Sequence, residues 1–130
     1  MLKDSGAFSG FSVDDLDKAK DFYGNVLGVS VEELPGMGLR LKLNGTNVFV
    51  YAKPDHQPAS FTVLNFEVAD IDAAIDELVA AGVSFEHYDN MPAPQDEKGV
   101  LRNDGDPLRG PQGIAWFKDP AGNILSVLQQ

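Results

Sequence analysis

Phe11-Ser12-Val13-Asp14-Asp15-Leu16 and Phe66-Glu67-Val68-Ala69-Asp70-Ile71 are the two stretches that decide the fold of this 130-residue sequence. The second follows the first at an offset of 55 residues, and the two agree in residue type at their first, third, fifth and sixth positions. Self-similarity at a fixed offset indicates two copies of one structural unit. In each copy apolar residues recur at alternate positions before an aspartate, which is typical of a strand that leads into an N-capped helix.

The residues after each aspartate predict a helix. Asp15 and Asp70 sit where a side chain would accept hydrogen bonds from the free N–H groups of a first helical turn. Gly24 and Gly82 fit the helix ends, where a left-handed conformation favours glycine. The second helix shows one apolar face at helical spacing, formed by Ile71, Ala74, Ile75 and Leu78.

Further strands follow each helix. Alternation or apolar runs predict strands at 39–43, 47–52, 114–118 and 124–128. Asn44-Gly45 and the segment 119–123 are typical of tight turns between them. The segment from Asn90 to Gln112 is rich in Pro and Gly and poor in apolar residues. We expect it to be mobile and to lie over or beside a cavity, or else to be a passive surface excursion.

Composition narrows the class of protein. The chain has no cysteine, which excludes disulfides and thiolate metal sites. Its net charge of −10 repels nucleic acid and suits a cationic small molecule, although solubility alone accounts for such a charge. Residues 1–6 do not resemble a signal peptide, and no apolar run reaches the roughly 18 residues of a membrane span. We therefore expect a cytoplasmic protein that contacts neither membrane nor nucleic acid.

Three segments in order resemble the vicinal-oxygen-chelate superfamily of glyoxalase, bleomycin-resistance and extradiol-dioxygenase proteins. They are 13–28 with its Leu27-Gly28, 66–82 with its Ala81-Gly82, and the closing segment from Trp116 to Ile124. The resemblance implies an α+β fold of two βαβββ modules, whose curved mixed sheets enclose a cavity. Module one would span about 5–53 and module two about 60–130. Members are commonly homodimers, so we expect one here.

The resemblance also implies where a metal would bind. Metal-dependent members carry His, Gln or Glu at four equivalent strand positions, which in this chain are Phe8, Val63, Ser126 and, with an uncertain register, Val50 or Tyr51. Three of these side chains have no lone pair for a metal, and a serine hydroxyl is a poor ligand for zinc or iron. Both histidines, His56 and His87, lie outside these positions. We therefore expect no bound metal and no cofactor.

The predicted ligand site is the sheet face opposite the helices. Phe11, Val13, Phe66 and Val68 form the large apolar set, so we assign them to the helix-covered side. Asn65 lies mid-strand on the other face, where a ligand or neighbouring backbone would bind its amide. One of the neighbours Trp116 and Phe117 faces the core, but their order is open. The predicted cavity residues are Phe8, Gly10, Val50, Val63, Asn65, Trp116 and Ser126, with Arg102 as an anion clamp on the long loop.

Three functions fit these residues. The first is a metal-free protein that binds a small organic molecule, as bleomycin-resistance proteins do, and we favour it. The second is a lyase, epimerase or dioxygenase-type enzyme with displaced metal ligands or metal-free acid–base chemistry. His87, in Phe85-Glu86-His87-Tyr88-Asp89, would be its titrating group, although we favour a surface strand edge leading into the loop as the explanation of that run. The third is an interaction module whose product is a dimer surface.

Overall fold

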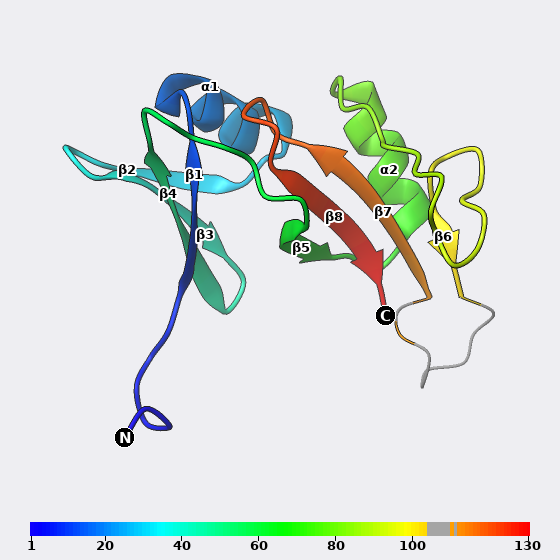
Figure 1. Cartoon of the computed structure of the whole chain (residues 1–130), viewed down its shortest axis with the longest axis horizontal. Helices are drawn as coiled ribbons and strands as arrows, with labels where there is room; N and C mark the ends of the chain where they lie inside the picture. Colours follow the sequence, from blue (N-terminus) through cyan, green and yellow to red (C-terminus); the bar gives the residue numbers. More distant parts are fainter. Residues whose placement is uncertain (104–109, 111) are drawn as a thin grey trace. The chain divides into compact units, whose positions relative to one another are not determined.

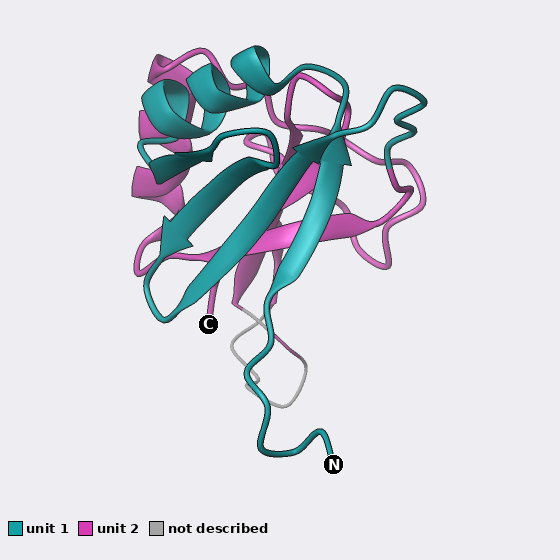
Figure 2. Ribbon diagram, turned by 90° about the vertical axis from the view of Figure 1, so that its left-hand side faces the viewer, with its two compact units in different colours: residues 1–58 teal, residues 59–130 magenta. Residues whose placement is uncertain are grey.

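The computed structural model describes residues 1–103, 110 and 112–130. The chain divides into two compact units, Met1–Pro58 and Ala59–Gln130, which Figure 2 shows in different colours. The division falls in the linker between the two expected modules. Leu108, Arg109 and the other residues of 104–109, together with Pro111, lie in the predicted loop but outside the described part.

Unit 1 has the order strand, helix, three strands (Figure 1). Its four strands form one sheet in the order β1-β4-β3-β2, in which β1 and β4 are parallel and the other pairs antiparallel. The elements are β1 (Ser9–Val13), α1 (Leu16–Asp21), η1 (Phe22–Val26), β2 (Ser30–Leu34), β3 (Gly38–Leu43) and β4 (Thr46–Ala52).

Unit 2 repeats this plan. Its sheet has the order β5-β8-β7-β6, again with one parallel pair, β5 and β8. The elements are β5 (Thr62–Glu67), α2 (Ile71–Ala80), β6 (Leu101–Arg102), β7 (Gly113–Lys118) and β8 (Ile124–Gln129). The expected α+β fold of two βαβββ units is thus confirmed. None of the described helices is long and apolar enough to cross a membrane.

Both helices begin where the aspartates predict. The Asp15 carboxylate accepts hydrogen bonds from the backbone N–H groups of Asp17 and Lys18 at 3.0 and 3.1 Å. Asp70 accepts one from Ala73 at 3.1 Å. The expected end at Gly24 is wrong, because α1 widens into the π-helix η1 and the positive φ, +73°, falls at Gly28. Gly82, with φ +101°, follows α2 as predicted.

The helix-covered face of each sheet is the core. In unit 1, Phe11 and Val13 are buried as expected, and the ring of Phe11 lies 6.0 Å from that of Tyr23 in η1. In unit 2, Phe66 and Val68 are only half-buried, so their predicted burial is wrong. The position in α2 that corresponds to the buried Tyr23 is Leu78, which is itself only half-buried.

The described part of the long loop is more ordered than its composition predicts. Val100 is 1% exposed. Its side chain and the side chain of Ile71 both lie next to Gly113, where an added Cβ would contact them. Leu101 and Arg102 form the short strand β6 against β7. Val100 is therefore buried although the loop is poor in apolar residues, because residues distant in sequence complete its environment.

Candidate functional site: the open faces of the two sheets

We call the sheet face opposite the helix of each unit its open face. In unit 1 the strand register places Gly10, Phe49, Arg40 and Glu32 in one row across β1, β4, β3 and β2. Gly10 contributes no side chain beside Phe49, and a Cβ there would approach the Phe49 carbonyl oxygen to 3.0 Å. The glycine therefore leaves one side of the Phe49 ring open.

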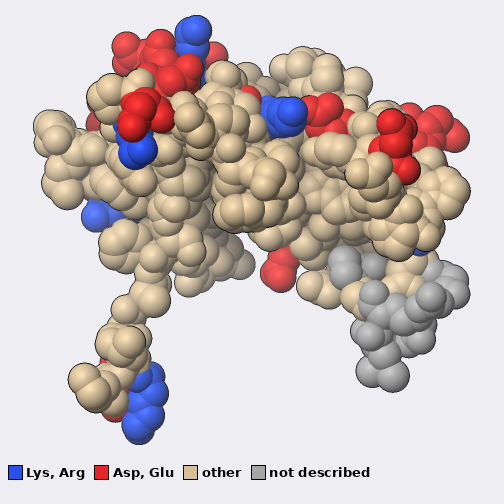
Figure 3. Space-filling view, viewed as in Figure 1, with Lys and Arg blue, Asp and Glu red and all other residues tan. Residues whose placement is uncertain are grey.

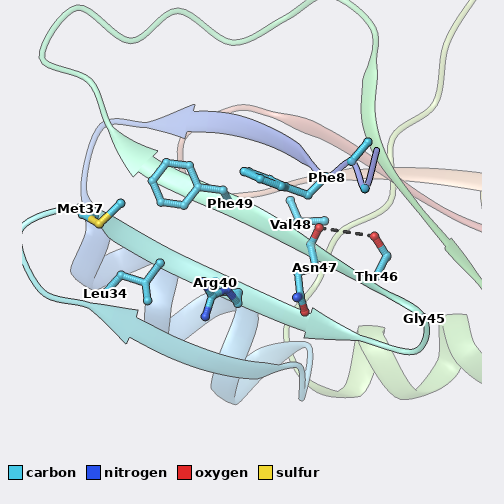
Figure 4. A pocket seen from close by; sticks show the side chains of 11 residues that line it. Phe8, Leu34, Met37, Arg40, Gly45, Thr46, Asn47, Val48 and Phe49 are labelled. Atoms are coloured by element: carbon cyan, nitrogen blue, oxygen red, sulfur yellow. Dashed lines mark hydrogen bonds between the residues drawn. The ribbon is translucent and has the colours of Figure 1, made fainter. Parts of the chain in front are cut away.

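A hollow, which we call the unit-1 recess, lies on this open face and has a volume of about 530 Å³. In Figure 4 the rings of Phe8 and Phe49 lie along one side of it, and Leu34 and Arg40 along the other. Phe8 is 73% exposed and Met37, which also lines the recess, is 67% exposed, so the recess presents two large apolar side chains to solvent. The full lining is Gly6, Ala7, Phe8, Leu34, Met37, Arg40, Gly45, Thr46, Asn47, Val48 and Phe49. Mostly apolar walls with a few polar groups are typical of small-molecule sites.

Arg40 is the one charged residue among the described residues that line the recess. Its guanidinium donates to the Glu32 carboxylate at 3.0 Å, and Lys42 lies 3.7 Å from the other oxygen of the same carboxylate. Two cations therefore share one anion on this face. Both partners of the Arg40–Glu32 pair are about two-fifths exposed, so the pair itself is weak.

The open face of unit 2 brings three predicted site residues together. Asn65 of β5, Ser126 of β8 and Trp116 of β7 are aligned across the sheet. The fully buried Ser126 hydroxyl donates to Asn65 Oδ1 at 2.6 Å. The Trp116 indole donates to the Thr62 hydroxyl at 3.1 Å, while the Tyr88 ring meets the indole edge-on at 5.9 Å. We call Thr62, Asn65, Trp116 and Ser126 the unit-2 cluster.

The strand register also shows which of the neighbours Trp116 and Phe117 lies in the core. Phe117 is fully buried on the helix-covered face and contacts the ring of Phe85 at 5.4 Å. Trp116 is half-buried and belongs to the open face. Burial, and then the charge of Glu86, raise the pKa of the Tyr88 phenol beside Trp116.

Val63 and Val50 do not lie as the sequence predicts. The β5–β8 register shifts between Thr62 and Leu64, so Val63 is an extra residue at a bulge and Thr62 takes its place on the open face. Val50 pairs with Phe11 and is fully buried in the unit-1 core. Of the two residues considered for that position, Tyr51 lies on the open face, where its ring stacks on Phe49 at 5.6 Å.

The four positions that bind metal in related proteins do not fit a metal here. On the open faces the structure places Phe8, Thr62 instead of Val63, Ser126, and Tyr51 instead of Val50, none of which is a common metal ligand. In the described residues no group of three His, Asp or Glu side chains lies close enough to hold an ion. His56 instead lies 2.6 Å from the Ser12 hydroxyl, and His87 lies on the surface.

Arg102 is engaged in structural bonds. It donates to Asp72 of α2 at 2.8 Å and to Asp96 at 2.9 Å. Lys98 adds ion pairs to Asp72 and Asp76 at 3.4 and 3.0 Å. We call these five residues the α2 clasp. Arg102 thus uses two of its five N–H donors within the clasp, and an anion clamp at Arg102 stays a prediction.

The hydrogen bonds of the clasp shift the pKa values of its titrating groups. The hydrogen bond from Arg102 lowers the pKa of the Asp72 carboxyl. Burial opposes ionisation of Asp96, but hydrogen bonds from Val100, Arg102 and Lys98 outweigh it and lower its pKa. Hydrogen bonds from Asp76 and Asp72 raise the pKa of Lys98. The Asp96 carboxylate also accepts from the backbone N–H groups of Lys98 and Val100 at 2.9 Å, which orders the loop locally.

Phe49, Arg40 and Met37 were absent from the predicted site. Strict alternation in 39–43 places Arg40 and Lys42 on the solvent face, which is the signal that could have identified Arg40. Phe49 lies in an apolar run, and only the pairing of this run with β1 and β3 determines which sheet face each of its side chains is on. Met37 lies in the turn between β2 and β3, where alternation predicts nothing.

The sequence matches the family model described as the glyoxalase/bleomycin resistance protein/dioxygenase superfamily over residues 8–127. No curated protein matches it.

Solved structures share the fold. A lactoylglutathione lyase from Agrobacterium tumefaciens is 21% identical with a TM-score of 0.67, over 97% of this chain and 93% of that one. TnmS3, an antibiotic binding protein from Streptomyces, is 25% identical with a TM-score of 0.64, over 97% of each chain. A glyoxalase/bleomycin resistance protein from the same source is 28% identical with a TM-score of 0.62, over 96% and 100%.

Proposed function

The chain belongs to the glyoxalase/bleomycin resistance protein/dioxygenase superfamily, and on that basis we propose that it binds a small organic molecule on the open faces of its sheets without a metal ion. The proposal takes the protein to be a cytoplasmic homodimer. The observation that carries it is the unit-1 recess, about 530 Å³ in volume, with the exposed Phe8 and the Phe49 ring in its wall.

The volume and the lining both suit a ligand. Sites for small molecules are hollows of about 300–1,000 Å³ with apolar walls and few polar groups. An aromatic side chain that stays exposed in the absence of a ligand gains stability when a planar molecule covers it. The unit-2 cluster supplies the same combination, since Trp116 is oriented by Thr62 and Asn65 by Ser126.

One solved relative supports binding over catalysis. TnmS3 is an antibiotic binding protein and is 25% identical to this chain over nearly its whole length. The enzyme alternative lacks comparable support, because the residues at the family's metal positions do not fit a metal ion. We therefore derive no reaction step for this chain.

A ligand screen by thermal shift tests the proposal. A molecule that binds only the native state stabilises it by about 2.7 kcal/mol at a concentration 100 times its Kd. This stabilisation raises the melting temperature. Phe49 and Val50, which are neighbours on opposite faces of β4, provide a matched pair of substitutions. We expect Phe49→Ala to abolish the shift with little loss of stability, because Phe49 lies in the recess.

Val50→Ala should do the reverse. Val50 is fully buried in the core, so the variant should unfold more easily and yet show a ligand-induced shift like that of the wild type. A library of aromatic molecules that produces no shift, or a shift that survives Phe49→Ala, would refute binding in the unit-1 recess.

A further inference from the structure

We propose that the unit-1 recess selects planar aromatic molecules that carry an acidic group, and that Arg40 binds this group. The inference rests on the proposed function and adds the chemical class of the ligand. The inference predicts an anionic ligand, whereas the net charge of the chain, −10, would by itself favour a cationic one.

The charge of the whole chain is not the charge at the recess. Acidic side chains gather over α1 and around α2 in Figure 3, and both helices lie on the core side of their sheets. Salt screens exposed charges beyond about 8 Å at physiological ionic strength. The side chains next to the recess therefore decide which ligand charge is preferred.

Those side chains leave one positive charge in excess. Arg40 lines the recess, and both Arg40 and Lys42 pair with the single carboxylate of Glu32. One Arg40 nitrogen, Nη1, bonds to one oxygen of Glu32 at 3.0 Å. A guanidinium has five N–H donors, so most of them stay available for an oxyanion.

The position of Arg40 sets the geometry of the ligand. Arg40 and Phe49 are direct cross-strand neighbours, and the other side of Phe49 faces Gly10. A flat ring that lies against Phe49 places a substituent at its edge near the guanidinium. Phe8 and Met37 supply apolar surface around the same ring. A carboxylate, sulfonate or phosphate on an aromatic ring satisfies both contacts.

Three probes with one ring system test the inference. They are 2-naphthoate, 2-naphthylmethanol and 2-naphthylmethylammonium, which are anionic, neutral and cationic at neutral pH. Binding is measured by isothermal titration at low salt. We expect 2-naphthoate to bind about tenfold more tightly than the alcohol, the scale of one charge-assisted hydrogen bond, and the ammonium to bind most weakly. Added salt should weaken only the naphthoate.

Arg40→Gln should remove the preference for naphthoate while the alcohol binds as before. Lys42→Gln makes the same change of charge two residues away and outside the lining, so its effect should be less than about threefold. Glu32→Gln frees Arg40 and should tighten naphthoate binding. Glu33→Gln is the matched control, because Glu33 is the adjacent residue, pairs with Lys20 at 3.0 Å and points to the other face.

The outcomes separate the two claims. If the ammonium binds as tightly as the naphthoate, or if Arg40→Gln leaves the preference intact, the inference is overturned. If the alcohol still binds and Phe49→Ala abolishes its binding, the proposed function survives that failure. If none of the three probes binds the wild type, both claims fail for this class of ring.

Discussion

The Ser126 hydroxyl lies at a position where related proteins place a metal ligand, but here it holds the carboxamide of Asn65. It is fully buried and donates its hydrogen to Asn65 Oδ1. The Asn65 Nδ2 group has no protein acceptor in the described part of the chain. A fixed oxygen therefore turns the amide N–H groups outward as hydrogen-bond donors beside Trp116.

Ser126→Ala should release this amide. The loss of this part-buried hydrogen bond is expected to lower the free energy of unfolding by about 1 kcal/mol, which urea denaturation would measure. In NMR spectra the two Asn65 side-chain N–H signals should move toward the values of a freely rotating amide. Ser9→Ala, at an exposed serine of β1, should change neither quantity. Unchanged Asn65 signals in Ser126→Ala would contradict the orienting role.

At the scale of elements, the α2 clasp explains how the described part of the Pro- and Gly-rich loop is held in place up to Arg102. Asp96 accepts two backbone hydrogen bonds and one from Arg102, and Arg102 bonds in turn to Asp72 of α2. The strand β6 that follows pairs with β7. The clasp therefore links the loop to the helix before the chain re-enters the sheet.

Asp96→Ala should loosen this segment. Two backbone N–H groups lose their acceptor, and we expect a loss of about 1–3 kcal/mol in the free energy of unfolding. Hydrogen exchange at the Val100 amide should accelerate more than exchange in β8. Asp89→Ala, at an exposed aspartate just before the loop that has no bonded partner among the described residues, is the control. Equal effects from both substitutions would show that the carboxylate of Asp96 has no special role.

The clasp also predicts a pH dependence. Asp72 and Asp96 have lowered pKa values in the folded chain, so their contribution is present above the ordinary carboxyl pKa, about 3.9, and is lost as the pH falls through the folded values. Lys98 has a raised pKa, so its contribution is present below about 10.5 and is lost at higher pH. The stability difference between wild type and Asp96→Ala should therefore shrink below about pH 4, as urea midpoints would show. A difference independent of pH would rule out the ionic contribution.

At the scale of the whole molecule, the sheet of each unit has two edge strands. Strands β1 and β2 are the edges of one sheet, and β5 and β6 those of the other. Exposed edges commonly pair with a second chain. We expect a homodimer by light scattering at micromolar concentration, with a melting temperature that rises with protein concentration. A monomer whose melting temperature is independent of concentration would exclude it.

Local chemistry explains which features the sequence predicts. The helix caps at Asp15 and Asp70 depend on bonds within three residues, so the pattern alone locates them. The open-face positions of Asn65 and Ser126 follow from strand alternation. The bulge at Val63 and the burial of Val50 depend on pairing between strands far apart in sequence, which alternation cannot fix. The bond from Arg102 to Asp72 could not be predicted for the same reason, because the two residues lie 30 positions apart.

The central claim is that the open faces bind a small molecule, and one titration tests it most directly. Adding 2-naphthoate to ¹⁵N-labelled protein should shift the amide signals of Gly10, Arg40, Asn47 and Phe49, which line or border the unit-1 recess. The signals of Ala19 and Ile75, in the helices on the covered faces, should stay in place. Shifts confined to the helices, or no shifts at millimolar ligand, would contradict the account.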